Sequence, residues 1–128
     1  MTAAAVAVAL CGPSSIWAGE NDWQVVRIVS EEYRFTPSKI LLDTRQPIRI
    51  EITNHGHEQH EFRSSLFRDQ LIDVETDAAV VRSKDLVSII IEENHTAVIK
   101  IIAPPAGRFD FECRIPSHHG MDGTIEVR

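Results

Sequence analysis

Nine residues near the C-terminal end of the sequence hold three kinds of side chain that bind soft metal ions. The stretch begins at Cys113 and reads Cys-Arg-Ile-Pro-Ser-His-His-Gly-Met. Cys113 and Met121 supply sulfur donors, and His118 supplies an imidazole nitrogen. Soft sulfur donors mixed with imidazole favour copper over hard ions such as magnesium. Taken alone, the segment fits either a copper-binding loop or a buried, inert thiol beside a surface histidine.

A second histidine-rich segment lies in the middle of the sequence. It runs from Asn54 to His60 and reads Asn-His-Gly-His-Glu-Gln-His. Because His60 is far from Cys113 in the chain, the two segments share a site only if the fold brings them together. A β-sandwich can do this, since the loops between its strands cluster at its two ends. His60 is therefore a candidate for a further imidazole ligand.

The rest of the sequence predicts an all-β fold. Strict alternation at Ile48, Ile50 and Ile52 indicates a strand with one buried face. Further β-type runs lie at 23–29, 32–35, 39–42, 87–91, 97–102, 109–112 and 125–127. Short strands separated by turns are typical of a β-sandwich. The stretch from Ser64 to Leu86 has no clear period, and we expect a long crossing connection there with a small helix or strand.

Composition narrows the class of protein. A chain of 128 residues suits one domain, and 43% hydrophobic and 25% charged residues are ordinary for a globular protein. The formal net charge of -6 argues against nucleic acid and anionic membranes as partners. It favours a partner with a basic docking surface. We expect a monomer.

Residues 1–18 differ from the rest and predict a signal peptide. They carry no charged side chain, and their apolar stretch is too short to span a bilayer. The alternatives are a frayed tail of a cytosolic protein and a lipid anchor at Cys11. Removal of the signal would leave a single domain at 19–128, periplasmic or secreted, with no transmembrane segment. Cys113 would then be the one remaining cysteine, and metal ligation would protect its thiol.

Taken together, the two segments resemble those of the cupredoxins, small blue copper proteins with a type 1 copper site. The resemblance covers residues 32–128 and rests on three short motifs. The motifs are Asn-x-Gly-x-x-x-His at Asn54, Gly56 and His60, Cys-x4-His-x2-Met at Cys113, His118 and Met121, and Phe-x-Pro-x-x-Ile at Phe35, Pro37 and Ile40. The first two occur in the family's order and at a plausible separation, which makes the resemblance specific.

The resemblance implies a Greek-key β-sandwich of about seven to eight strands that holds one copper ion per chain. His60, Cys113 and His118 would be the strong ligands and Met121 the weak axial ligand, as in blue-copper sites. Asn54 would lie behind these ligands and pin the two ligand loops together.

Some features depart from the family pattern. The Cys-x4-His interval is azurin-like and the His-x2-Met interval is amicyanin-like, which leaves the axial bond and the reduction potential open. Ser117 stands where glycine often precedes the ligand histidine. His119 directly follows His118 and competes with it, although only one residue would then separate the ligand from Met121.

The leading functional prediction is a one-electron carrier, not an enzyme, that exchanges electrons with redox proteins at an exposed edge near His118. The alternative is a copper-handling protein, such as a chaperone or resistance protein, because His55, His57 and His119 lie near the expected site. The pair at His55 and His57 is interpreted as part of a solvated loop, with an accessory metal site as the other interpretation.

Several further acidic, histidine and aromatic residues are placed outside the expected metal site. The residues expected on solvated faces or in surface turns are Glu31, Glu32, Glu92, Glu93 and His95, with a docking patch as the alternative for either acidic pair. The aromatic residues expected in the core are Phe62, Phe109 and Phe111.

Overall fold

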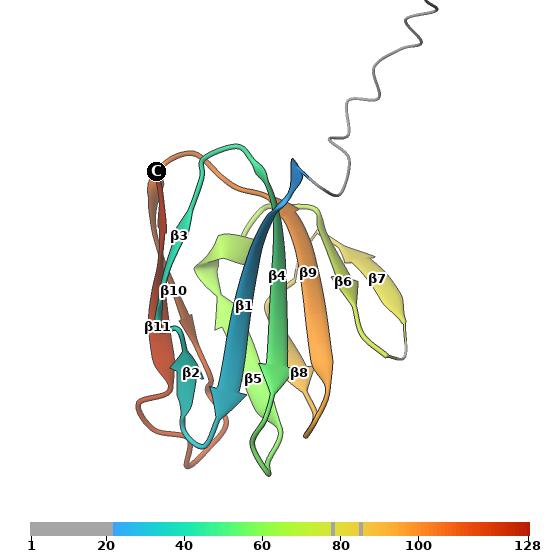
Figure 1. Ribbon diagram of the computed structural model, residues 1–128, viewed down its shortest axis with the longest axis vertical. Helices are drawn as coiled ribbons and strands as arrows, with labels where there is room; N and C mark the ends of the chain where they lie inside the picture. Colours follow the sequence, from blue (N-terminus) through green and yellow to red (C-terminus); the bar gives the residue numbers. More distant parts are fainter. Residues whose placement is uncertain (1–21, 78, 85) are drawn as a thin grey trace, which may run out of the picture.

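The computed structural model describes residues 22–77, 79–84 and 86–128, so the expected signal peptide at 1–18 lies outside the described residues. The strands are β1 (Gln24–Glu31), β2 (Arg34–Thr36), β3 (Lys39–Leu42), β4 (Pro47–Asn54), β5 (His60–Ser64), β6 (Ile72–Glu75), β7 (Val80–Ser83), β8 (Ser88–Ile91), β9 (Thr96–Ile102), β10 (Gly107–Glu112) and β11 (Asp122–Val127). They form two sheets packed face to face (Figure 1). The predicted all-β sandwich is confirmed.

The two sheets differ in size. One has six strands in the order β2-β1-β4-β9-β6-β7, and the other has five in the order β3-β11-β10-β5-β8. Most neighbouring strands are antiparallel, but β1 runs parallel to β4 and β3 runs parallel to β11. The parallel pair β1 and β4 matters for the site, because both strands end at the same edge, where Ser30 is paired with Asn54.

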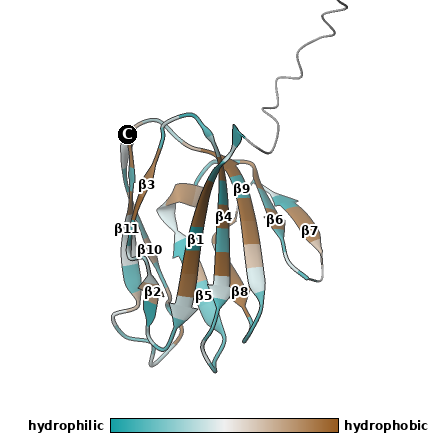
Figure 2. Cartoon of the chain, in the orientation of Figure 1, coloured by the Kyte–Doolittle hydropathy of each residue, from teal (hydrophilic) through white to brown (hydrophobic). Residues whose placement is uncertain are grey.

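Strand β4 lies at the centre of the larger sheet and follows the predicted alternation. Ile48, Ile50 and Ile52 are fully buried, whereas the residues between them are half-buried. β-branched side chains suit a pleated surface that packs on one face. Figure 2 shows hydrophobic residues along β1, β4 and β9, with hydrophilic residues in the loops at the lower end.

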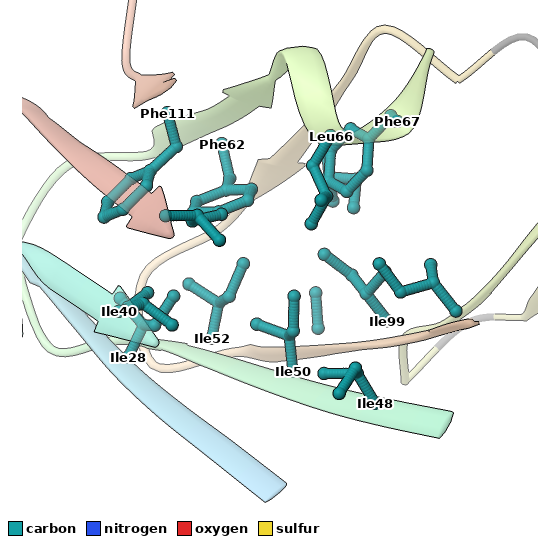
Figure 3. Packing of buried hydrophobic residues seen from close by; sticks show 14 of the residues in the cluster. Ile28, Ile40, Ile48, Ile50, Ile52, Phe62, Leu66, Phe67, Ile99 and Phe111 are labelled. Atoms are coloured by element: carbon teal, nitrogen blue, oxygen red, sulfur yellow. The ribbon is translucent and has the colours of Figure 1, made fainter. Parts of the chain in front are cut away.

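The core lies between the sheets. Figure 3 shows Phe62 and Phe111 of one sheet facing Ile28 and Ile52 of the other. The rings of Phe62 and Phe111 stack with centroids 5.2 Å apart, which adds to the gain from burial. Phe109 was expected in the core with them, but it is only half-buried and packs against the edge of the core.

The stretch from Ser64 to Leu86 contains more regular structure than expected. A short 3-10 helix at Ser65–Phe67 buries Leu66 and Phe67, and the chain then crosses to the larger sheet as β6 and β7. Together with β5, which also lies outside the predicted runs, these strands raise the total to eleven in the described residues, above the seven to eight expected.

One end of the sandwich gathers three connections. The β1–β2 turn, the β4–β5 loop and the β10–β11 loop all lie at the lower end in Figure 1. The β4–β5 and β10–β11 loops carry the two histidine-rich segments, and the β1–β2 turn carries Glu32. Within the described ranges no helix is long and apolar enough to cross a membrane.

Candidate metal centre

Three side chains from the two distant segments meet at this end of the sandwich. The ligand atoms of His60, Cys113 and His118 all lie within 4.8 Å of one another. All three residues are buried, with exposed fractions of 0% for His60, 7% for Cys113 and 6% for His118. A thiol and two imidazoles at this spacing can hold a single metal ion.

His60 is the first residue of β5, which directs its side chain into the sandwich. Its Nδ1 is buried and has no hydrogen-bond partner within the described chain. Its Nε2 lies 3.3 Å from Oε1 of Glu32, which is within ion-pair distance, but the two atoms do not form a hydrogen bond. Burial and the neighbouring His118 lower the pKa of the imidazole, which favours the neutral form that binds metal.

Cys113 follows β10 and begins the second loop. Its Sγ accepts the backbone N–H of Glu61 at 3.3 Å and lies 3.5 Å from Nδ1 of His118. An N–H aimed at sulfur stabilises a thiolate and influences the potential of a metal bound to it. The backbone N–H of Cys113 also donates to the carbonyl of Met121 at 2.9 Å, which closes the loop at its base.

A tight turn directs His118 inward. Its backbone N–H donates to the carbonyl of Ile115 at 3.0 Å. Ser117, where glycine was expected by resemblance, has φ of 76°, in the left-handed region that disfavours side chains. His119, the residue after His118, is exposed. The structure therefore places His118 in the cluster and His119 in solvent. Met121 is 2% exposed and lies at the end of the loop.

Asn54 organises the first loop and does not pin the two loops directly. Its Nδ2 donates to the carbonyls of Glu58 at 2.7 Å and Ile91 at 3.0 Å, and its Oδ1 accepts the N–H of Gly56 at 2.8 Å. These bonds hold the β4–β5 loop closed and tie it to β8. Direct bonds between the loops come from Glu61, which was not anticipated.

Glu61 links the two loops through its backbone and its side chain. In addition to the bond to Cys113, its Oε1 accepts the backbone N–H of Arg114 at 3.1 Å. Burial acts to raise the pKa of the Glu61 carboxyl, but the Arg114 N–H and neighbouring donors outweigh it and hold the pKa below its usual value.

Glu32 was expected on a solvated face, but it reaches into the site. Its Oε1 accepts the backbone N–H groups of His57 at 2.6 Å and Glu58 at 2.9 Å. Burial would raise the pKa of this carboxyl, yet these N–H donors and His60 keep it below the usual value. An added Cβ at Gly56 would lie 2.3 Å from the same oxygen, so glycine is required there for Glu32 to approach.

Tyr33 and Glu58 cover the histidines from outside. The Tyr33 ring lies 4.8 Å from the His118 ring and 6.5 Å from the His60 ring, measured between centroids. Its hydroxyl donates to Glu58 Oε1 at 3.3 Å, and the charge of Glu58 raises the pKa of Tyr33. Glu58 Oε2 lies 2.7 Å from Nε2 of His118. His118 itself is buried, and the residue exposed beside it is Tyr33, at 42%.

The remaining histidines stay outside the cluster. His55, His57 and His95 are exposed, as expected for loop residues. His57 Nδ1 lies 3.5 Å from Glu93, and His95 Nδ1 lies 2.7 Å from the Glu93 carbonyl. Neither His55 nor His57 joins a group able to hold a metal within the described residues.

Comparison with known proteins supports the motif resemblance. A family model described as a cupredoxin-like domain matches residues 1–127. The chain belongs to the cupredoxin-like family. Comparison of this cupredoxin with curated proteins gives no match.

Solved structures with the same fold fall into two groups. Auracyanin from Roseiflexus castenholzii is 18% identical with a TM-score of 0.61, and the match covers 82% of this cupredoxin and 97% of that chain. Auracyanin A from Chloroflexus aurantiacus, a "blue" copper protein, is 19% identical with a TM-score of 0.59, covering 83% and 99%. Multicopper oxidase McoA from Aquifex aeolicus is 16% identical with a TM-score of 0.67, covering 87% and 30%.

The two groups differ in the fraction of the matched chain that this cupredoxin covers. The cupredoxin spans nearly all of an auracyanin, but 44% of a multicopper oxidase that is 12% identical to it and 30% of McoA. At these identities the likeness shows the fold alone.

The donor set fits one copper ion per cupredoxin chain. The unpartnered Nδ1 of His60 is the clearest sign, because a buried polar atom without a partner is costly unless a bound group satisfies it. When bound, copper supplies one-electron redox chemistry between Cu(I) and Cu(II). His60 and His118 would offer nitrogen and Cys113 sulfur.

Proposed function

We propose that this cupredoxin is a one-electron carrier with a type 1 copper site. His60, Cys113 and His118 are the strong ligands in this proposal, and Met121 is the weak axial ligand. The observation that carries it is the buried group of two imidazoles and one thiol within 4.8 Å. A trigonal His₂Cys set with a weak axial thioether is the arrangement used for electron transfer.

The surroundings of the site suit that role. The ligands come from loops fixed to two packed sheets, and the Glu61 N–H and Asn54 amide hold the loops in place. A site that is held rigidly rearranges little when its charge changes. His60 and His118 offer nitrogen, which Cu(II) prefers, and Cys113 offers the soft sulfur that Cu(I) prefers.

The partners in this proposal are redox proteins that approach the end of the sandwich near Tyr33. The half-exposed ring of Tyr33 contacts His118, so a docked partner reaches the site through it. The net charge of -6 supports a partner with a basic surface. We also propose that the carrier is a monomer that works in the periplasm or outside the cell.

The proposed carrier is not itself an enzyme. Multicopper oxidases and a copper-containing nitrite reductase share the fold, but the match covers 44% of one oxidase, 30% of McoA and 31% of the reductase. The match to nearly the whole of each auracyanin supports this part of the proposal, as does the cluster of His60, Cys113 and His118.

Copper handling is the second candidate function. The exposed His55, His57 and His119 favour it, because they lie in the two loops next to the cluster. Metal exchange separates the two functions. A protein that delivers copper surrenders Cu(I) quickly to an acceptor, whereas an electron carrier retains the metal through repeated redox cycles.

The absorption and EPR spectra of the Cu(II) form test the proposed site. We expect an intense visible thiolate-to-copper band, its loss in Cys113→Ser and its persistence in the matched loop variant His119→Gln. A reversible redox couple should accompany the band. An unchanged spectrum in Cys113→Ser would contradict the proposal and direct attention to the loop that carries His55 and His57.

A further inference from the structure

The outer nitrogens of both buried histidines face carboxylates. Glu58 Oε2 lies 2.7 Å from Nε2 of His118, and Glu32 Oε1 lies 3.3 Å from Nε2 of His60. Only the first contact has hydrogen-bond geometry. The Glu58 carboxylate is therefore the side chain that acts most directly on the cluster from outside.

The ring orientation of His118 determines what Glu58 can do. Nδ1 faces Sγ of Cys113 at 3.5 Å, so this nitrogen points toward the other candidate ligands. If Nδ1 binds a metal, the ring proton must reside on Nε2, where it can be donated to Glu58. A ligating histidine that donates its other N–H to a carboxylate has a fixed orientation and a more basic ligand nitrogen.

Three contacts hold Glu58 in position. Its backbone N–H donates to Glu32 at 2.9 Å, its carbonyl accepts from Asn54 at 2.7 Å, and its carboxylate accepts the hydroxyl of Tyr33. The first two contacts hold the backbone of Glu58, and the Tyr33 hydroxyl and His118 Nε2 contact its carboxylate, although the side chain is 49% exposed.

We infer that Glu58 is a positioning residue. It makes Nδ1 of His118 a stronger metal ligand and stabilises Cu(II) relative to Cu(I). This inference rests on the proposed copper site. The physical reason is charge: the carboxylate lies at the far end of the imidazole, where it offsets the extra positive charge of the oxidised ion. The cupredoxin then has a lower reduction potential than it would have without Glu58.

The variant Glu58→Gln tests this inference, because its side-chain oxygen can still accept the Nε2–H while the negative charge is lost. Cu(II) and Cu(I) affinities are measured separately on the full chain by competition with chelators, and the potential by voltammetry. We expect Cu(II) affinity to fall by about 10–100-fold, with a smaller change for Cu(I). Each tenfold fall in Cu(II) affinity relative to Cu(I) affinity raises the reduction potential by about 59 mV for one electron.

The matched control is Glu93→Gln. Glu93 also lies on a loop and is half-exposed, but its carboxylate faces the exposed His57. A change in ratio for Glu58→Gln that exceeds the change for Glu93→Gln supports a direct effect through His118. Equal ratios in the two variants would overturn the inference, as would loss of the thiolate band in Glu58→Gln, since that loss would indicate a structural role.

Failure of the proposed function looks different. If the unaltered chain shows no thiolate-to-copper band, the copper site itself is wrong. If that band is present in the unaltered chain and in Glu58→Gln with the same affinity ratio, only the role of Glu58 is wrong.

Discussion

The backbone N–H of Glu61 donates to the Sγ of Cys113 at 3.3 Å, across 52 positions of sequence. The bond joins the first residue after His60 to the first residue of the second loop. It therefore sets the distance between the two segments that meet in the cluster. The Glu61 carboxylate strengthens the same connection by accepting the backbone N–H of Arg114.

Truncation of Glu61 should weaken this connection. Glu61→Ala leaves the bond to sulfur possible but removes the acceptor for Arg114, whose N–H then loses a charged partner. We expect the free energy of unfolding in urea to fall by about 1.5 kcal/mol. The control Glu126→Ala removes an exposed carboxylate from β11 and should change it by less than about 0.5 kcal/mol. Equal losses in the two variants would show that the Glu61 carboxylate does not strengthen the connection between the loops.

Much of the sandwich could be predicted from sequence because its long strands alternate clearly. The buried isoleucines of β4 and the ordered motifs around His60 and Cys113 were sufficient for the fold class and for the side chains that meet. The strand β7 could not be recognised because its residues are exposed or half-buried, so its sequence shows no alternation between a buried and an exposed face.

The groups around the cluster were harder to predict than the cluster. Glu32 belongs to an acidic pair that is ordinarily solvated, and its role depends on the parallel pairing of β1 with β4. That pairing brings the end of β1 beside Asn54, so the following turn reaches the β4–β5 loop. Sequence offers one indirect sign, the glycine at position 56, which is needed because Glu32 comes so close.

Gly56 and Glu32 should be energetically coupled. In Gly56→Ala the new methyl group would displace the Glu32 carboxylate, which then loses the N–H groups of His57 and Glu58. We expect a loss of about 1–3 kcal/mol in unfolding free energy. In a Glu32→Ala background, Gly56→Ala should cost much less, since the oxygen is gone. Additive effects in this double-mutant cycle would contradict the steric explanation.

The loop on either side of His118 should respond in opposite directions to two substitutions. Ser117 and Gly120 both have positive φ, at 76° and 74°. Ser117→Gly removes a left-handed penalty of roughly 1–2 kcal/mol, partly offset by the greater freedom of glycine when unfolded. Gly120→Ala adds that penalty with no atom within 4 Å of the new methyl group. Urea midpoints of the metal-free protein should rise for the first variant and fall for the second.

The β6–β7 hairpin should contribute a small acid-dependent term to stability. The Asp73 pKa is lowered, chiefly by its hydrogen bond from Arg82, from a usual value of 3.8. The unfolded state therefore binds more protons than the folded state below that value, and stability falls as the pH drops through the lower folded pKa. Because the pair is partly exposed, we expect less than about 1 kcal/mol. Unfolding curves at pH values above 3.8 and at successively lower values should show a smaller loss of stability in Asp73→Asn.

Tyr33 should control access to the proposed copper. Its ring covers His118 and His60, so Tyr33→Ala exposes both, whereas Tyr33→Phe keeps the ring and removes only the hydroxyl. We expect a chelator to remove copper about tenfold faster from Tyr33→Ala, with Tyr33→Phe close to the unaltered protein. Equal acceleration in both variants would assign the effect to the hydroxyl and Glu58. A slow rate with the ring in place agrees with a carrier that keeps its metal while it exchanges electrons.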